Sequence, residues 1–424
     1  MRKRIMFLLV SVIAVASLLL ITVMMTERNV EIADEKKELT VWGDDASVQR
    51  MFLDVYGENS DYVLNFVHVE NEEMAEKIQL HLALHEPIGD ICILDNSTVN
   101  QIEGEKYFAD LEEEFELKKE LLYNIQNEAL FNSAGHLWAV PGTLSAAGMA
   151  YNRSLMEEEF GLEDPVEVRY EFNSWADLIS KGKSIKRKNR DIKMFSSLSD
   201  VAMILFGQSK YKYVEDGKLL EPSRFQNYFT IMKVLQDEDL VGNEQMFSPQ
   251  WYQNMKTQEI LFYPCSMTLL QSGIFEMGQP WGFTRACSGS YNMTGKVWAI
   301  SSNSEEKAMA YDFLHHLLLS DAGARYAKNR KNSFFIDYKP AYELEGYRNL
   351  TVSTFNGQNI GEMLFETIIP ETENIERGEY SNQVEEIFME TTLRMMDDPD
   401  LTIQQCYDSF ISECEKKLNQ VIRQ

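Results

Sequence analysis

The folded part of the chain opens with strand-like runs that alternate with helical stretches. Apolar residues recur at helical spacing in Val48–Tyr56 and again from Met74 to Leu82. Runs rich in β-branched and aromatic residues, which are typical of strands, precede and follow these stretches. They are Leu39–Trp42, Tyr62–Val69 and Asp90–Leu94. Strands that alternate with helices predict an α/β lobe with a largely parallel sheet.

The same alternation returns after a middle region that is richer in aromatic residues and helices. In this region Phe225–Leu235 is predicted as a helix and Ile260–Pro264 as a buried strand. Val297–Ile300 is the next predicted strand, and Ser302–Glu305 has the pattern of a capping box. The helix that follows carries its apolar residues on one face. They are Ala310, Phe313, Leu314, Leu317 and Leu318. An amphipathic helix over Phe410–Val421 is predicted near the end of the chain.

The N-terminus carries a compartment signal. Basic residues from Arg2 to Arg4 precede an apolar run from Ile5 to Met25. Because basic flanks stay in the cytoplasm, the rest of the chain is predicted to lie outside the cell membrane. The run fits a cleaved signal peptide or an uncleaved membrane anchor, since it would reach about 31 Å at about 1.5 Å per residue. Residues 26–37 are charged and lack apolar periodicity, so we interpret them as a linker.

Charge and cysteine content exclude several classes of partner. The net charge of −27 repels the phosphates of nucleic acids and anionic lipids, so no nucleic-acid partner is expected. The five cysteines are scattered and form neither a disulfide framework nor a metal-binding spacing. We therefore predict that the protein uses no metal and no cofactor.

Six motifs, in this order along the chain, point to one family. They are LTVWGDD, GDICILDNSTVNQIEGEKYFADLEEEF, HLWAVPGTLSAAGMAYNRSLMEEEFGLEDP, NSWADLI, ILFYPCSMTLLQSG and GKVWAISSNSEEKAMAYDFLHHLLLSDAGARYAKNRKNSFF. In this order they resemble the sugar-type extracellular solute-binding proteins of bacterial ABC importers, the maltose-binding-protein-like family. The resemblance implies a two-lobed α/β clamp that binds a small polar solute, a sugar or oligosaccharide, and presents it to ABC permease subunits.

The resemblance also implies how the two lobes divide the chain. Lobe one is expected to comprise residues 38–143 and 296–336, and lobe two residues 144–295 and 337–424. The chain would cross between them near Pro141–Gly148, Ser288–Gly295 and Phe335–Tyr342. Ligand would bind in the cleft between the lobes.

Carboxylates at the ends of predicted strands are the first candidate ligand-binding residues. Asp44 and Asp45 follow the first strand, and Asp95 and Asn96 follow the third. Ligands of open α/β sheets bind outside the carboxyl ends of the strands, and a carboxylate accepts several hydroxyl hydrogen bonds at once. The alternative for Asp44 and Asp45 is a solvated turn or helix cap, and for Asp95 a cap of the next helix.

The other candidates rest mainly on the resemblance. Ser145 stands in the first crossing, where maltodextrin-binding relatives have a carboxylate, and Ser266 follows a buried strand of the second lobe. Trp281 is a candidate stacking platform for a sugar ring, and Tyr380 stands where relatives offer a late aromatic residue. The alternatives are a buried hydroxyl for Ser266, a core residue for Trp281 and an exposed loop residue for Tyr380.

The sequence offers no catalytic motif. It contains no Gly-x-Ser-x-Gly elbow, no HExxH and no P-loop, so the protein is predicted not to be an enzyme. Two other functions stay open. One is a ligand-sensing module for a membrane sensor kinase, which an uncleaved anchor would suit. The other is a secreted carbohydrate-active enzyme, which would need two carboxylates at a defined separation.

Overall fold

The computed structural model describes residues 36–424, except for short gaps at residues 59, 124–127, 189–190, 257–258, 272–273, 277–279, 294, 330–334, 344–345, 353–354, 373–379 and 422–424. The predicted signal peptide or anchor at residues 1–25 and most of the predicted linker therefore lie outside the described residues. Within the described part, no helix combines the length and the apolar character needed to cross a membrane.

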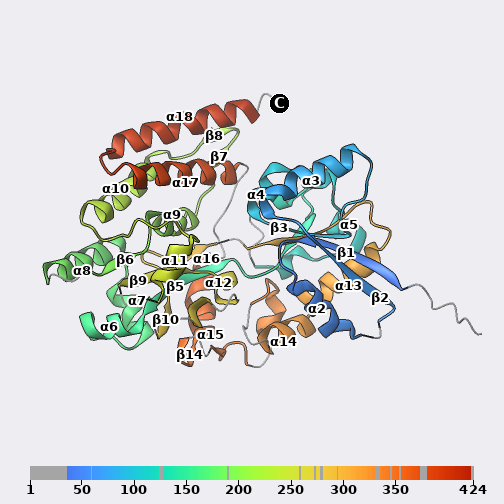
Figure 1. Cartoon of the computed structure of the whole chain (residues 1–424), viewed down its shortest axis with the longest axis horizontal. Helices are drawn as coiled ribbons and strands as arrows, with labels where there is room; N and C mark the ends of the chain where they lie inside the picture. Colours follow the sequence, from blue (N-terminus) through green and yellow to red (C-terminus); the bar gives the residue numbers. More distant parts are fainter. Residues whose placement is uncertain are drawn as a thin grey trace, which may run out of the picture.

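Two five-stranded sheets lie side by side in the molecule (Figure 1). The first sheet has the strand order β2-β1-β3-β12-β4. Its strands are β1 (Lys37–Gly43), β2 (Tyr62–His68), β3 (Ile91–Leu94), β4 (Ala139–Pro141) and β12 (Val297–Ile300). β1 pairs with β2 and β3 in parallel, whereas β12 is antiparallel to β3 and β4. The strands that the sequence predicts over residues 39–42, 62–69, 90–94 and 297–300 are confirmed.

The helices of the first sheet follow its strands. They are α2 (Ser47–Tyr56), α3 (Asn71–Ala83), α4 (Asn96–Gln101), α5 (Leu111–Phe115), α13 (Lys307–Leu318) and α14 (Asp321–Asn329). The predicted apolar face of α13 is buried, as expected from its spacing. The predicted capping box at Ser302–Glu305 is wrong. The Ser302 hydroxyl donates to the carbonyl of Tyr107 (3.0 Å), and Ser304 instead accepts a bond from the Glu306 N–H (3.0 Å).

The second sheet has the order β10-β5-β9-β6, and β11 also pairs with β5. Its strands are β5 (Ala146–Asn152), β6 (Lys193–Phe195), β9 (Ile260–Cys265), β10 (Trp281–Thr284) and β11 (Tyr291–Asn292). Two small hairpins add β7 (Val214–Glu215) with β8 (Lys218–Leu219) and β13 (Thr351–Val352) with β14 (Gln358–Asn359). Strand β5 is buried along its whole length because it lies between β9 and β10 and its two faces pack into two hydrophobic cores.

Helices cover the second sheet and continue above it. They are α6 (Arg153–Phe160), α7 (Pro165–Glu171), α8 (Trp175–Arg187), α9 (Leu198–Gly207), α10 (Ser223–Asp237), α11 (Pro249–Asn254), α12 (Met267–Gln271), α15 (Ile360–Met363), α16 (Ile369–Thr372), α17 (Ser381–Asp397) and α18 (Ile403–Val421). The predicted C-terminal helix is confirmed, but it begins at Ile403. Helix α9 is buried on almost every side because α10 and α17 pack over it.

The two faces of the second sheet belong to different hydrophobic cores. Along β5, Ala146 and Ala150 join the core that continues into the first sheet, whereas Ala147, Met149 and Tyr151 face the core beneath α9, α10, α17 and α18. This alternation is the period of two that a strand covered on both faces requires. The two lobes thus share apolar packing close to the crossings.

The chain passes between the sheets at neighbouring places. It leaves the first sheet after Pro141 and enters the second at Ala146, and it returns between Asn292 and Val297. Three backbone hydrogen bonds of 2.8 Å tie the crossings together. They run from Met293 to Ser145, from Gly142 to Lys296 and from Leu144 to Phe335. These two passages overlap the predicted crossings at Pro141–Gly148 and Ser288–Gly295. The predicted crossing at Phe335–Tyr342 and the residue limits of the two lobes stay predictions.

Candidate functional site

A row of polar residues ends the strands of the first sheet next to the crossings. Trp42 pairs with Cys92, Leu94 with Val297, and Val297 with Pro141. The residues that follow β1, β3 and β4 and precede β12 therefore stand at one edge of the sheet. We call this group, the polar residues Asp44, Asp95 and Lys296 together with Gly142, the rim.

Asp44 is held from two sides. Asn71 Nδ2 at the start of α3 donates to Asp44 Oδ2 (3.0 Å), and Lys296 Nζ donates to Asp44 Oδ1. The pair with Lys296 is partly buried, with side-chain exposures of 31% for the lysine and 21% for the aspartate. Both oxygens of the carboxylate thus have partners within the first lobe.

Asp45 and Asp95 both fasten helix starts. Ser47 donates its N–H to Asp45 Oδ1 and its hydroxyl to Asp45 Oδ2, and both donor–acceptor distances are 2.8 Å. The Asp45 side chain is exposed. Asp95 is the N-cap of α4, because its Oδ1 accepts the N–H of Thr98 (2.8 Å). Asp95 thus caps a helix, whereas Asp45 stabilises the turn before α2, whose N-cap is Ala46. The second oxygen of Asp95 has no hydrogen-bond partner among the described residues.

Asn96 is the first residue of α4 and Tyr380 directly precedes α17, and these two helices meet across the two lobes. Asn96 begins α4, and its Oδ1 is buried without a hydrogen-bond partner in the described part of the chain. Tyr380 directly precedes α17 in a left-handed conformation (φ 59°). Helix α17 contacts α4, and Figure 1 shows them next to each other between the lobes. The structure brings the elements of these two candidates together.

The two serine candidates are buried and hydrogen-bonded. The Ser145 hydroxyl donates to Asn292 Oδ1 (3.3 Å) and joins the first crossing to the second. The Ser266 hydroxyl accepts the N–H of Leu269 (3.2 Å) at the start of α12. In this conformation both hydroxyls form hydrogen bonds within the protein, and both side chains are buried.

Trp281 does not offer a ring face to a ligand in this structure, which corrects the sequence prediction. Its side chain is 0% exposed and packs edge-to-face against Tyr263 (5.5 Å) and Phe275 (5.6 Å). The physical reason is its place on β10, whose four residues are all buried in the core. Trp251 is buried as well, and its indole N–H donates to Asp200 Oδ1 (2.9 Å). Burial raises the pKa of this Asp200 carboxyl well above its usual range.

Sequence reasoning missed three polar residues near the rim. Lys296 precedes β12, Thr143 follows Gly142, and Thr268 is exposed on α12 of the second lobe. The hydroxyls of Thr143 and Thr268 lie 3.3 Å apart and join the two lobes. A Cβ on Gly295 would lie 2.6 Å from the Thr143 hydroxyl, so the glycine permits this approach. The antiparallel pairing of β12, which places Lys296 beside Asp95, is not visible in the sequence.

A cluster with metal-ligating side chains has a structural role. One ligand atom from each of Asp110, Glu113 and His136 lies within 4.8 Å of the others. The oxygens of Asp110 already accept the N–H groups of Glu112 and Glu113 and the side chains of Asn132 and His136. Burial raises the pKa of Asp110, but these hydrogen bonds outweigh burial and the pKa is lowered. The carboxylate is saturated by protein donors.

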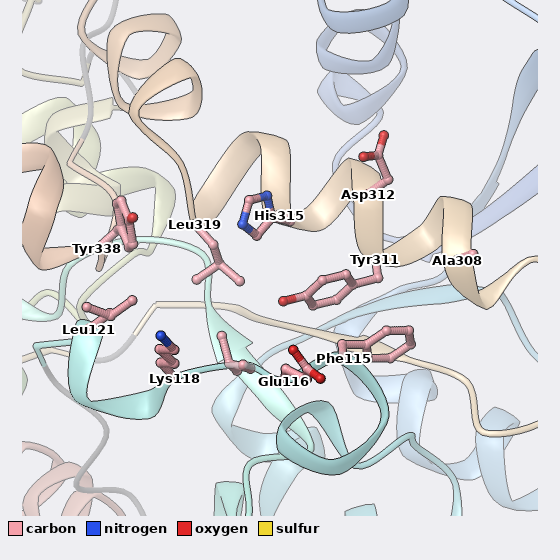
Figure 2. A pocket seen from close by; sticks show the side chains of 11 residues that line it. Phe115, Glu116, Lys118, Leu121, Ala308, Tyr311, Asp312, His315, Leu319 and Tyr338 are labelled. Carbon is pink, nitrogen blue, oxygen red and sulfur yellow. The ribbon is translucent and has the colours of Figure 1, made fainter.

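A pocket of about 470 Å³ lies beside α13, and none of the rim residues lines it. Figure 2 shows α13 on one side of it and the segment after α5 on the other. It is lined by Phe115, Glu116, Leu117, Lys118, Leu121, Ala308, Tyr311, Asp312, His315, Leu319 and Tyr338. None of the predicted ligand-binding residues is among them, and the rings of Phe115 and Tyr311 stack on each other (4.3 Å).

Residues 52–332 match the family described as bacterial extracellular solute-binding protein. The chain belongs to this family. The match includes every strand of the two five-stranded sheets except β1, so the predicted family and the solute-binding role are confirmed. No curated protein matches the sequence.

Solved structures of solute-binding proteins share the fold. An extracellular solute-binding protein of family 1 is 17% identical, with a TM-score of 0.73 over 90% of this chain and 100% of its own. An ABC-transporter-associated binding protein from B. animalis subsp. lactis, in complex with β-1,6-galactobiose, is 14% identical (TM-score 0.71; 91% and 98%). The sugar-binding protein MalE from Xanthomonas citri is 11% identical (TM-score 0.69; 91% and 98%). The predicted two-lobed fold is thus confirmed for this solute-binding protein.

Proposed function

We propose that this solute-binding protein captures a sugar or oligosaccharide at the rim and delivers it to the permease of an ABC importer. The observation that carries the proposal is the rim, where Asp44 and Asp95 end neighbouring strands beside the crossings. One structural neighbour is known in complex with β-1,6-galactobiose and another is a sugar-binding protein, which supports the carbohydrate class.

The mechanism is differential affinity, with no bond made or broken. Rim carboxylates accept ligand hydroxyls from the first lobe, while the start of α17 and the exposed Thr268 approach from the second. Only a closed clamp contacts the ligand from both sides, so ligand shifts the population toward closure. A permease that recognises the closed form then takes only loaded protein.

The N-terminal segment sets the place of action. A basic, apolar N-terminus keeps the body of the chain on the outer side of the cytoplasmic membrane, either released after cleavage or tethered by residues 1–25. In both cases the protein meets solute before the permease does.

The test is a thermal-shift and calorimetry screen of residues 36–424 with β-1,6-galactobiose, D-tagatose and maltotriose, and with amino acids for comparison. At a hundred times its dissociation constant, a ligand adds about 2.7 kcal/mol to the free energy of unfolding. We expect a shift with a sugar and recovery of the sugar unchanged. A shift only with amino acids, or turnover of the sugar, would contradict the proposal.

Asp95→Asn tests the rim itself. The amide keeps an oxygen for the Thr98 N–H but loses the charge, so stability should hold while sugar affinity falls about tenfold or more. Asp164→Asn is the matched control, because Asp164 caps α7 through the same kind of bond (2.8 Å) in the second lobe. Equal sugar affinity in the two variants would show that Asp95 is not part of the binding site.

A further inference from the structure

The ammonium of Lys296 reaches across the end of a strand. β1 and β12 are separated by β3, so the ends of β1 and β12 stand about 10 Å apart at the usual strand spacing. Lys296 nevertheless bonds to Asp44, which follows β1. Its side chain must therefore extend over the end of β3, where Asp95 stands.

This placement changes what Asp44 can bind. Its Oδ1 accepts from Lys296 and its Oδ2 accepts from Asn71. A cationic solute that approached this carboxylate would have to displace an ammonium that the chain itself supplies. A tethered group competes at a high effective concentration.

A neutral polyhydroxyl solute can bind at the rim without competing with the ammonium of Lys296. Each hydroxyl can donate to a carboxylate and accept from an ammonium. The ammonium of Lys296 has three donors, of which Asp44 takes one. Such a solute can therefore add bonds without breaking the Lys296–Asp44 pair.

We propose that Lys296 is a specificity-determining residue that excludes cationic solutes from the rim and admits uncharged polyhydroxyl solutes. The inference rests on the proposed function, because it takes the rim as the binding site. It deepens that function by restricting the solute class: amino sugars with free ammonium groups, polyamines and divalent cations are excluded.

The experiment compares the full protein with Lys296→Met, using spermidine and calcium as cationic probes in calorimetry. Removing the ammonium frees Asp44 Oδ1, so cation affinity is expected to rise by about tenfold or more. Adding Asp44→Asn to Lys296→Met should abolish the gain, and Lys296→Arg should retain the exclusion. The sugar found in the screen should bind Lys296→Met about tenfold more weakly, since ammonium donors are lost.

The matched control is Lys307→Met. Lys307 pairs with Glu114 (2.7 Å) on the same lobe, and its side-chain exposure of 30% equals that of Lys296 within one per cent. It should leave the affinity for both kinds of probe unchanged. The melting temperature of each variant is measured to check that the variant folds.

Two results would overturn the inference: spermidine binding the natural protein as tightly as Lys296→Met, or neither protein binding the cations. The proposed function fails separately, if no sugar binds the natural protein. The cationic probes decide the role of Lys296 in either case.

Discussion

Replacing Glu371 by glutamine is expected to lower the free energy of unfolding by about 3 kcal/mol at pH 7, because it leaves a buried charge without its partner. Arg285 Nε donates to both oxygens of Glu371 (2.8 Å each), and Ser290 donates its N–H and hydroxyl to Oε2 (2.8 Å each). The arginine side chain is only 14% exposed. Ser290 directly precedes β11, the last strand before the chain returns to the first sheet, so this network ties α16 to that strand. Urea unfolding of both proteins measures the loss.

The effect of Glu371→Gln should depend on pH. Burial raises the pKa of Glu371, but hydrogen bonds from Ser290 and Arg285 outweigh burial and the pKa is lowered. A lowered folded-state pKa stabilises the protein above the unfolded value of about 4.3, and this contribution disappears as the pH falls through the folded pKa. The difference between the two proteins should therefore shrink below about pH 4.3. A loss that is constant from pH 7 to pH 3.5 would contradict this reading.

A control variant separates this network from ordinary surface ion pairs. Glu171 pairs with Lys181 (2.6 Å) but is 53% exposed. Exposed pairs contribute about 0–1 kcal/mol, so Glu171→Gln should change the free energy of unfolding by less than about 1 kcal/mol. Equal losses in the two variants would mean that the bonds of Glu371 are not special.

Replacing Gly282 by alanine should destabilise the protein by about 3 kcal/mol or more, the cost of overpacking a tight core. Gly282 on β10 pairs directly with Tyr151 on β5, and the tyrosine ring covers it. A Cβ on Gly282 would lie 2.1 Å from Tyr151 Cζ. Tyr151 is fully buried, so moving its ring would require its neighbours in the core to shift as well.

Gly43→Ala is the matched control for Gly282→Ala, because it also lies in a strand. A Cβ there would lie 3.4 Å from Ile93, an ordinary contact. Thermal unfolding should show a small change for Gly43→Ala and a large one for Gly282→Ala. The reverse order would mean that the Tyr151 ring readily leaves its position.

The strands and the family could be predicted because their signals are local. The buried run Ile91–Leu94 and the apolar face of α13 follow from spacing alone. The capping box failed because Ser302 finds a partner in Tyr107, almost two hundred residues earlier in the chain. Local pattern cannot reveal such a competing contact.

The candidate site was harder to predict than the fold. Asp44 and Asp95 can be predicted as site residues because they follow strands, and strand ends are local features. Lys296 was missed because its partner Asp44 lies across two strand pairings. Trp281 was assigned to the site from its residue type, but its burial is decided by the ring contacts of Tyr263 and Phe275.

The distance between the lobes in solution tests the central claim most directly. Spin labels on Glu76→Cys in α3 and Lys417→Cys in α18 stand at exposed positions of different lobes, and all five native cysteines are buried. The distance between the two labels is measured by pulsed electron paramagnetic resonance, with and without a saturating concentration of the sugar identified in the screen. A clamp predicts a distribution that becomes shorter or narrower with the sugar and is unchanged by an amino acid that gives no thermal shift. A distribution that does not respond to a bound sugar would contradict capture between the lobes.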